Sequence, residues 1–288
     1  MAGTALTTRE VARLLSVSEA TIKRWADDGL IQSDKTVGGH RRFGLAGIAR
    51  FQRERGGAPQ RSAAQGARKP AFREKASTSL LFQHLIAGNE DETGALLINA
   101  YLHGTSLALL CDRVVTPAMH QIGELWYRGE LTIADEHLAT QTAITALQKL
   151  RGVIHLAVPS ELKALICGVE GDLHELPIHL SQVLLENEGW DVINLGPNTP
   201  FFAVAEALSK HRPRLLCISA KLMTDPDRLG RDYAHVLKAA SKLGSAIVLG
   251  GDGFADSLLS KRFPSEFYAK NFEQLLNFTR SLAPIDSQ

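Results

Sequence analysis

Four short apolar runs alternate with helical stretches in the second half of the chain. They cover residues 164–169, 192–195, 215–219 and 247–249. Each run is almost continuously apolar, which is the pattern of a strand that helices cover on both faces. Strands that alternate with helices in this way form parallel sheets. Residues 160–284 are therefore predicted to form a doubly wound, parallel-sheet α/β domain.

Helical periodicity precedes the sheet. Apolar positions recur at helical spacing in residues 80–86, 95–102, 107–126 and 138–150, with glycine-containing breaks between them. Residues 73–152 are therefore predicted to form a four-helix bundle. Pro117 lies inside the third pattern and should kink or split that helix, because proline has no N–H to donate.

Residues 56–72 combine Gly, Pro, Ser, Gln and basic residues without apolar periodicity. This composition is typical of a flexible linker. Residues 1–55 in front of it therefore form a separate folding unit, and the chain as a whole is a multidomain protein of α and α/β parts.

Two short helices are predicted in this first unit. Thr8 is a plausible N-cap for a helix that reaches Leu14 and Leu15, and Ser18 is the expected N-cap of the second helix. The turn between them is only a few residues long, which suits a helix-turn-helix whose second helix enters the major groove of DNA. The candidates for contacts with bases and phosphates near the start of that helix are Thr21, Lys23 and Arg24.

A basic hairpin follows at residues 35–43, where glycines permit a tight turn. Its side chains can reach phosphates or a narrow minor groove, and the candidates are His40, Arg41 and Arg42. Trp25 and Phe43 are expected in the small core with Leu14 and Leu15. The segments EVARLL, TIKRW, DGLI and GGHRRF, in this order, resemble the winged helix-turn-helix of MerR-type transcriptional regulators over nearly all of residues 4–54. This resemblance implies a double-stranded DNA operator as partner.

Charge is distributed unevenly along the chain. Residues 1–70 hold 13 Lys and Arg against 6 Asp and Glu, whereas the rest holds 19 against 25. A basic front favours nucleic acid, because the release of counterions from phosphates gives affinity without sequence choice. No apolar run reaches the roughly 18 residues of a membrane helix, and the start lacks a signal-peptide pattern. We expect a cytoplasmic, nucleoid-associated protein without a membrane partner, whose three cysteines are buried thiols.

Polar residues and glycines follow the predicted strands of the α/β domain. In parallel sheets the carboxyl ends of the strands meet at one edge, where ligands bind. The candidates at this edge are Asp172, His174, Ser219, Gly250 and Gly251. A neutral imidazole can ligate a metal, and Asp172 could orient His174 by accepting a hydrogen bond from its other nitrogen. A solvated or core histidine and an ordinary glycine turn are the alternatives.

These positions resemble the base-off, histidine-on cobalamin domains. The resemblance implies a Rossmann-like cobalamin-binding domain in which His174 is the lower axial ligand of cobalt. It also implies that Ser219 forms hydrogen bonds with the cofactor tail and that the paired glycines leave room for it. Pro177 stands where the family has Gly, and Lys221 stands where it has an apolar residue. A ring and a cation near the tail channel could narrow it or weaken the affinity.

In the predicted bundle, Trp126 and the pair Glu136 and His137 resemble the cap motif of the cobalamin-dependent light-sensing repressors, often of carotenoid genes. The resemblance implies that Trp126 covers the upper face of the corrin and that Glu136 and His137 line the space of the 5′-deoxyadenosyl group. Bundle core and a solvated helix start are the alternatives. Tyr127 stands where that family has a His that captures cobalt after illumination, so a bis-histidine photoproduct formed that way is excluded. His137 or water could take that position, or photosensing could be lost.

As a whole, the resemblance implies a MerR-type repressor with a C-terminal cobalamin-binding module and no catalytic role. Adenosylcobalamin, or another cobalamin, would favour a homo-oligomer, either a dimer or a tetramer. The oligomer would present several copies of the DNA-binding unit at residues 1–55, called the head below, to DNA, and light would cause it to release the operator. One alternative is a repressor that binds no cobalamin and is controlled by a protein antagonist. A corrinoid carrier is a further alternative, against which the DNA-binding head argues.

Overall fold

The computed structural model describes residues 5–14, 18–36, 38–44, 47–48, 51, 74–154, 161–256 and 261–282. The predicted linker at 56–72 lies outside this range. The chain forms two compact units. Met1–Ser106 and Arg113–Leu156 belong to the first unit, and Leu107–Asp112 and Ala157–Gln288 belong to the second.

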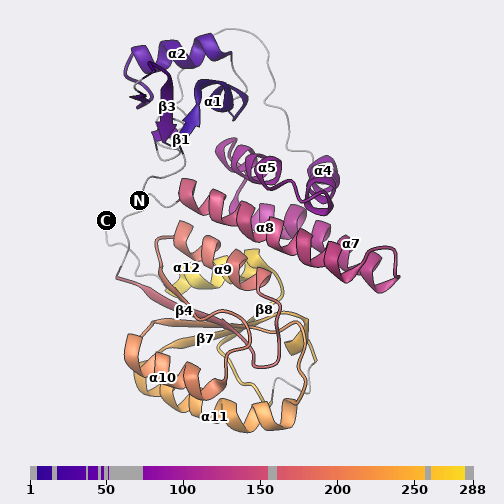
Figure 1. Cartoon of the computed structure of the whole chain (residues 1–288). Helices are drawn as coiled ribbons and strands as arrows, with labels where there is room; N and C mark the ends of the chain where they lie inside the picture. Colours follow the sequence, from indigo (N-terminus) through magenta and orange to yellow (C-terminus); the bar gives the residue numbers. More distant parts are fainter. Residues whose placement is uncertain are drawn as a thin grey trace. The chain divides into compact units, whose positions relative to one another are not determined.

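The start of the chain folds as the predicted winged helix-turn-helix. Helices α1 (Thr8–Leu14) and α2 (Glu19–Asp27) lie beside a three-stranded antiparallel sheet (Figure 1). The order of its strands is β1-β3-β2. They comprise β1 (Ala5–Thr7), β2 (Asp34–Lys35) and β3 (Arg41–Gly44). The hairpin of β2 and β3 is the predicted wing, whereas β1 was not predicted.

The two helices of the head begin at hydrogen-bonded caps. Thr7, one residue before the predicted cap, accepts a hydrogen bond at Oγ1 from the N–H of Glu10 at 3.2 Å. Its own N–H donates to Glu10 Oε2 at 2.6 Å, which completes a capping box. Ser18 caps α2 as predicted, because its hydroxyl accepts from the N–H of Thr21 at 3.2 Å.

Apolar side chains form the core of the head. Ile22 and Phe43 are fully buried, and the ring of Trp25 lies 4.8 Å from that of Phe51. The predicted core position of Phe43 is thus confirmed, whereas Trp25 is half-buried and packs against Phe51. The side chain of Leu14 and all of Leu15 lie outside the described residues.

The predicted four-helix bundle is present after the head. Its helices are α4 (Glu74–Ile86), α5 (Glu90–Leu102), α7 (Thr116–Tyr127) and α8 (Ile133–Ile154). Helices α5 and α8 pack closely at Gly94, where an added Cβ would come within 3.0 Å of Lys149 Cδ. The buried side chains include Leu81, Leu85, Leu97, Ile98, Ala118, Ile122, Ala143, Leu147 and Leu150.

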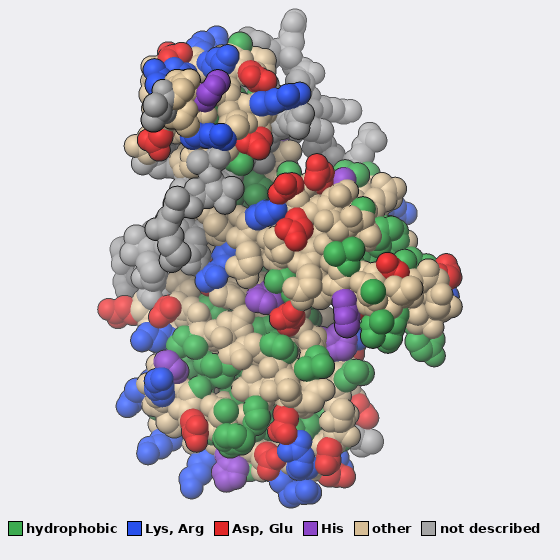
Figure 2. Space-filling model, in the orientation of Figure 1, with side chains coloured by type: hydrophobic (Ala, Val, Ile, Leu, Met, Phe, Trp, Pro, Cys, Tyr) green, Lys and Arg blue, Asp and Glu red, His purple; other side chains and the backbone are tan. Residues whose placement is uncertain are grey.

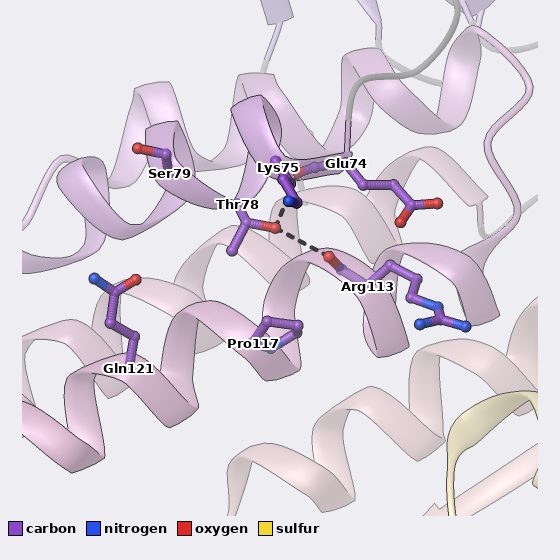
Figure 3. Close-up of a pocket in the computed structure, with 7 residues that line it drawn as sticks. All are labelled: Glu74, Lys75, Thr78, Ser79, Arg113, Pro117 and Gln121. Atoms are coloured by element: carbon purple, nitrogen blue, oxygen red, sulfur yellow. Dashed lines mark hydrogen bonds between the residues drawn. The ribbon is translucent and has the colours of Figure 1, made fainter.

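Pro117 splits the third helical pattern, as its missing N–H predicts. The chain forms α6 (Leu107–Leu110), a π-helix (Cys111–Val115) and then α7, with Pro117 in its first turn. Because Pro117 cannot donate to the carbonyl of Arg113, four residues earlier, that oxygen needs another donor. The hydroxyl of Thr78 on α4 lies 3.0 Å from this oxygen and 3.0 Å from the Glu74 carbonyl of its own helix, so the two carbonyls share its single proton (Figure 3). This bond lies beside a shallow groove of about 330 Å³.

The second unit is the predicted doubly wound α/β domain. Its five strands are all parallel, in the order β5-β4-β6-β7-β8. Helices α9 and α12 cover one face of the sheet, and α10 and α11 cover the other (Figure 1). The strands are β4 (Lys163–Gly168), β5 (Asp191–Asn194), β6 (Leu215–Ser219), β7 (Ala246–Gly250) and β8 (Phe267–Ala269). The helices are α9 (Leu176–Asn187), α10 (Phe201–His211), α11 (Pro226–Leu243) and α12 (Phe272–Leu282), with a 3₁₀ turn at Asp252–Phe254.

Aromatic rings fill the core beneath α10 and α11. The ring of Tyr233 lies 5.3 Å from those of Phe201 and Phe263, and its hydroxyl donates to the Pro264 carbonyl at 2.9 Å. The cysteines are buried free thiols, as predicted, and burial raises their pKa. In the described part of the chain, no helix is long and apolar enough to span a membrane.

The segment Leu107–Asp112 is part of this second unit although it lies within the sequence of the bundle. The Asp112 carboxylate accepts hydrogen bonds from the N–H groups of Phe272 at 2.9 Å and Glu273 at 3.0 Å. These N–H groups belong to the first turn of α12, where no helical carbonyl is available. A carboxylate 160 residues away in sequence thus caps the last helix.

We predict that Thr78→Val, which keeps the shape of the side chain, weakens the bundle near Pro117 by about 1 kcal/mol, because the Arg113 carbonyl loses a donor. Amide exchange of residues 113–127, measured on the full chain, should accelerate about fivefold by the same estimate. Ser79→Ala, at the next position of α4, is the matched control and should leave exchange unchanged. Equal protection in Thr78→Val and the wild type would contradict the assigned role of this hydrogen bond.

Candidate functional site

The order of the strands places a topological switch point between β4 and β6. From β4 the chain continues to β5 on one side, whereas β6 pairs with β4 on the other side. The loops after β4 and β6 therefore leave the sheet in different directions, which is where open α/β sheets bind ligands. Asp172 and His174 lie in the loop after β4, as predicted.

The Asp172 carboxylate connects these two loops. Its Oδ1 accepts from the Nδ1 of His174 at 2.6 Å and from the N–H of His174 at 3.1 Å. Its Oδ2 accepts from the N–H of Lys221 at 2.5 Å and of Leu222 at 3.4 Å, both in the loop after β6. The Asp172 side chain is 2% exposed, so these bonds replace the water that the carboxylate loses on burial.

The hydrogen bonds of Asp172 also determine which ring nitrogen of His174 carries a proton. Burial by itself raises the pKa of Asp172, but the bonds from the ring and N–H of His174 and from the N–H of Lys221 together lower it. The ionised carboxylate only accepts, so Nδ1 of His174 is the protonated nitrogen. In the neutral ring, Nε2 then has the lone pair that a metal needs. The His174 side chain is 50% exposed.

A third loop, which sequence reasoning missed, completes this edge. Asn198 follows β5 and accepts from the N–H of Gly171 at 2.8 Å, and its own N–H donates to the Asp172 carbonyl at 2.9 Å. Its φ is +51°, a left-handed conformation that Asn tolerates. The preceding Gly196-Pro197 pair is a turn signal in the sequence. That signal could have located the turn, but not its contact with Asp172.

The two predicted glycines differ in what surrounds them. A Cβ on Gly250 would lie 3.5 Å from the Ala269 carbonyl oxygen, an ordinary contact. A Cβ on Gly251 would lie 2.3 Å from the Ala220 carbonyl oxygen, and its φ is +95°. Packing inside the fold therefore explains Gly251, without a cofactor. Ser219 pairs in register with Gly250 at the ends of β6 and β7.

The structure accommodates both residues that depart from the family pattern in this domain. Pro177 lies in the first turn of α9, where a missing N–H costs nothing, as predicted. The Lys221 ammonium forms an ion pair with Asp252, which follows β7. Lys221 thus contributes its N–H to Asp172 and its side chain to the neighbouring loop.

In the bundle, Trp126 and Tyr127 end α7 with 46% and 87% of their surface exposed. The alternative of Trp126 as a buried core residue is therefore wrong. Figure 2 shows apolar side chains gathered at the end of the bundle where α7 and α8 meet. Glu136 in the first turn of α8 accepts from the Thr140 hydroxyl at 2.9 Å, and its other oxygen lies 3.7 Å from His137 Nε2.

The predicted DNA-binding residues of the head fall into two groups. Lys23 and Arg24 are exposed on α2, and His40 is exposed in the wing. Arg41 instead donates to the Lys23 carbonyl at 2.8 Å and forms an ion pair with Asp27. Its side chain is 17% exposed, so Arg41 holds the wing against α2.

The remaining two predicted residues of the head are half-buried. The hydroxyl of Thr21 lies 2.9 Å from that of Ser18, within the cap of α2. Arg42 lies in β3, where it pairs in register with Thr7 on one side and Asp34 on the other.

Two families match the chain. Residues 5–56 match the family described as helix-turn-helix domain, and residues 80–151 match the family described as B12 binding domain. The second match covers most of the helical bundle. The chain therefore combines a helix-turn-helix domain with a B12 binding domain, and the combination predicted from the sequence is confirmed.

Proteins of two kinds are similar to this chain, a transcriptional repressor and corrinoid proteins. The chain is 24% identical to the HTH-type transcriptional repressor CarA of Myxococcus xanthus, over 93% of this chain and 94% of CarA. It is 23% identical to dimethylamine corrinoid protein 3 of Methanosarcina acetivorans, over 60% of this chain and 81% of that protein. The structure of the Methanosarcina barkeri monomethylamine corrinoid protein matches this chain with a TM-score of 0.61 at 16% sequence identity. The match covers 73% of this chain and 100% of that protein. The last likeness establishes the fold.

We predict that Gly251→Ala destabilises the α/β domain by more than about 2 kcal/mol, because a Cβ would meet the Ala220 carbonyl in a backbone conformation that L-residues avoid. Gly250→Ala is the matched variant and should change stability by less than about 1 kcal/mol, since its Cβ finds an ordinary contact. Urea unfolding of the full chain measures both. Equal losses in the two variants would show that the Ala220 contact is not the reason for Gly251.

We also predict that substitutions of two basic residues of the head have different effects, one on DNA binding and one on stability. Lys23→Gln should weaken DNA binding and lower the slope of log affinity against log salt by about 0.9, as for one lost phosphate contact. Arg41→Gln should lower the melting temperature of the head, since the wing loses its bonds to α2. Fluorescence titrations with duplex DNA at several salt concentrations and calorimetry distinguish the two. A stable Arg41→Gln head that loses only DNA affinity would refute the structural role of Arg41.

Proposed function

We propose that this protein is a transcriptional repressor that binds its operator in the dark with adenosylcobalamin and releases it in light. Two family matches, to a helix-turn-helix domain and to a B12 binding domain, support the combination of DNA and cobalamin binding. Similarity to a transcriptional repressor over 93% of the chain supports the regulatory role. Carotenoid or photoprotective genes are the proposed targets.

The Asp172–His174 pair is the observation that most strongly supports a cobalamin. A corrin already supplies four equatorial nitrogen ligands, so the protein needs to provide a single neutral donor. In its neutral form His174 is such a donor, because the ionised carboxylate 2.6 Å away holds the proton on Nδ1 and leaves the lone pair on Nε2. The pair lies at the carboxyl edge where this fold binds ligands. We propose Nε2 of His174 as the lower axial ligand, with Ser219, Gly250 and Gly251 beside the cofactor tail.

The exposed residues of the bundle are proposed to serve the same cofactor. The indole of Trp126 offers a flat apolar face for a macrocycle, and Glu136 and His137 offer polar groups for an adenosyl moiety. When bound, adenosylcobalamin would supply a cobalt–carbon bond that light breaks. We propose that loss of the adenosyl group changes the contacts of Trp126, Glu136 and His137. This difference would shift a homo-oligomer toward a form that presents fewer heads to DNA.

One observation favours a second candidate function. The Lys221–Asp252 ion pair lies between the loops that follow Ser219 and Gly250, where the tail is proposed to bind. If it closes this region, the chain is a repressor that binds no cobalamin and responds to a protein antagonist. The exposed Tyr127, in place of a cobalt-capturing His, agrees with a module that has lost its light response.

The test is an absorption spectrum of the full chain, mixed with adenosylcobalamin in the dark, desalted, and then illuminated with green light. The wild type should retain the cofactor and change its spectrum on illumination. His174→Ala should lose the lower-ligand signature, whereas His211→Ala, a histidine at the end of α10, should match the wild type. Cofactor that elutes unbound from the wild type would overturn the light-sensing function and leave the cobalamin-independent repressor.

A further inference from the structure

The loops that follow β6 and β7 remain joined beyond the ends of the strands. The N–H of Ala220 donates to the Gly250 carbonyl at 3.0 Å, and the N–H of Gly253 donates to the Ala220 carbonyl at 2.8 Å. Lys221 and Asp252 are the next side chains along these loops, and their ion pair closes the gap between them. The position of the pair is thus fixed by backbone hydrogen bonds on both sides.

The same Lys221 is part of the Asp172–His174 assembly. Its N–H donates to Asp172 Oδ2, while Oδ1 of the same carboxylate holds the ring of His174. A single buried carboxylate therefore separates the backbone of Lys221 from the proposed cobalt ligand. The loop that carries the Lys221 side chain is thus bound directly to the carboxylate that orients the proposed cobalt ligand.

The ion pair between Lys221 and Asp252 is exposed, so another anion can reach the ammonium. The side chains of Lys221 and Asp252 are 42% and 68% exposed. Exposed ion pairs of this kind contribute little to stability, because water and salt screen them. Another anion that is held at the site by a second binding interaction can therefore replace the Asp252 carboxylate, since an ammonium also binds phosphate as a point charge.

We propose that Lys221 leaves Asp252 and binds the phosphodiester of the nucleotide loop of the corrinoid. This inference rests on the proposed function. A complete cobalamin contains one anionic phosphodiester, whereas a cobinamide has lost its nucleotide loop. Lys221 thus selects complete corrinoids, and Asp252 competes with the phosphodiester for the ammonium.

The proposal predicts opposite effects for the two partners. Lys221→Met should weaken the binding of adenosylcobalamin about tenfold, and Lys221→Arg should restore most of it. Asp252→Asn should strengthen the binding of adenosylcobalamin, because the ammonium no longer has a competing carboxylate. None of these three substitutions should change the affinity for adenosylcobinamide, which has the same upper ligand. Lys238→Met, an exposed lysine on α11, is the control and should match the wild type with both ligands.

Absorbance titrations of the full chain in the dark at two salt concentrations measure these affinities. The proposal is supported if Lys221→Met loses affinity for adenosylcobalamin only, and if this loss of affinity is smaller at high salt. An unchanged ratio of the two affinities in Lys221→Met, or stronger binding of both corrinoids, overturns it and leaves the proposed function intact. A wild-type chain that binds neither corrinoid overturns the proposed function and this inference together.

Discussion

The ligand edge of the α/β domain depends on the buried carboxylate of Asp172. Its two oxygens accept bonds from the loop after β4 and the loop after β6, and its carbonyl accepts from Asn198 after β5. Three loops that diverge from the sheet are thereby held by one residue. Such a buried charge is costly unless every lone pair finds a donor, and here four N–H groups donate to it. The bond to the His174 ring also determines which of its nitrogens carries a proton, so the loop structure and the ligand chemistry depend on one group.

Much of this architecture could be predicted from local patterns. Apolar runs located four strands and helical spacing located the four bundle helices, because both follow from which faces are buried. Strand β8 was not predicted, because its three residues are too few to show an apolar pattern. The cap of α1 was misplaced by one residue because Thr7 and Thr8 are equally good caps in sequence, and only the bond to Glu10 distinguishes them.

The residues of the candidate site could be predicted from the sequence, but most of their hydrogen-bond partners could not. The bond between Asp172 and His174 is local, spanning two positions, and could be proposed from their spacing. The contacts of Asp172 with Asn198 and Lys221 depend on how three loops meet, which no local pattern encodes. In the head, the sequence could not separate Arg41 from Arg42, because charge alone does not reveal which guanidinium pairs with Asp27.

The assignment of Leu107–Asp112 to the second unit has a topological consequence. The chain passes from one unit to the other three times, after Ser106, after Asp112 and after Leu156. Cleavage at one of these points cannot release a complete unit. A fragment that begins after Leu156 would lack the Asp112 carboxylate and leave the first N–H groups of α12 without that acceptor. The two units are therefore interlaced in covalent connectivity, and neither can be excised as a continuous stretch of sequence.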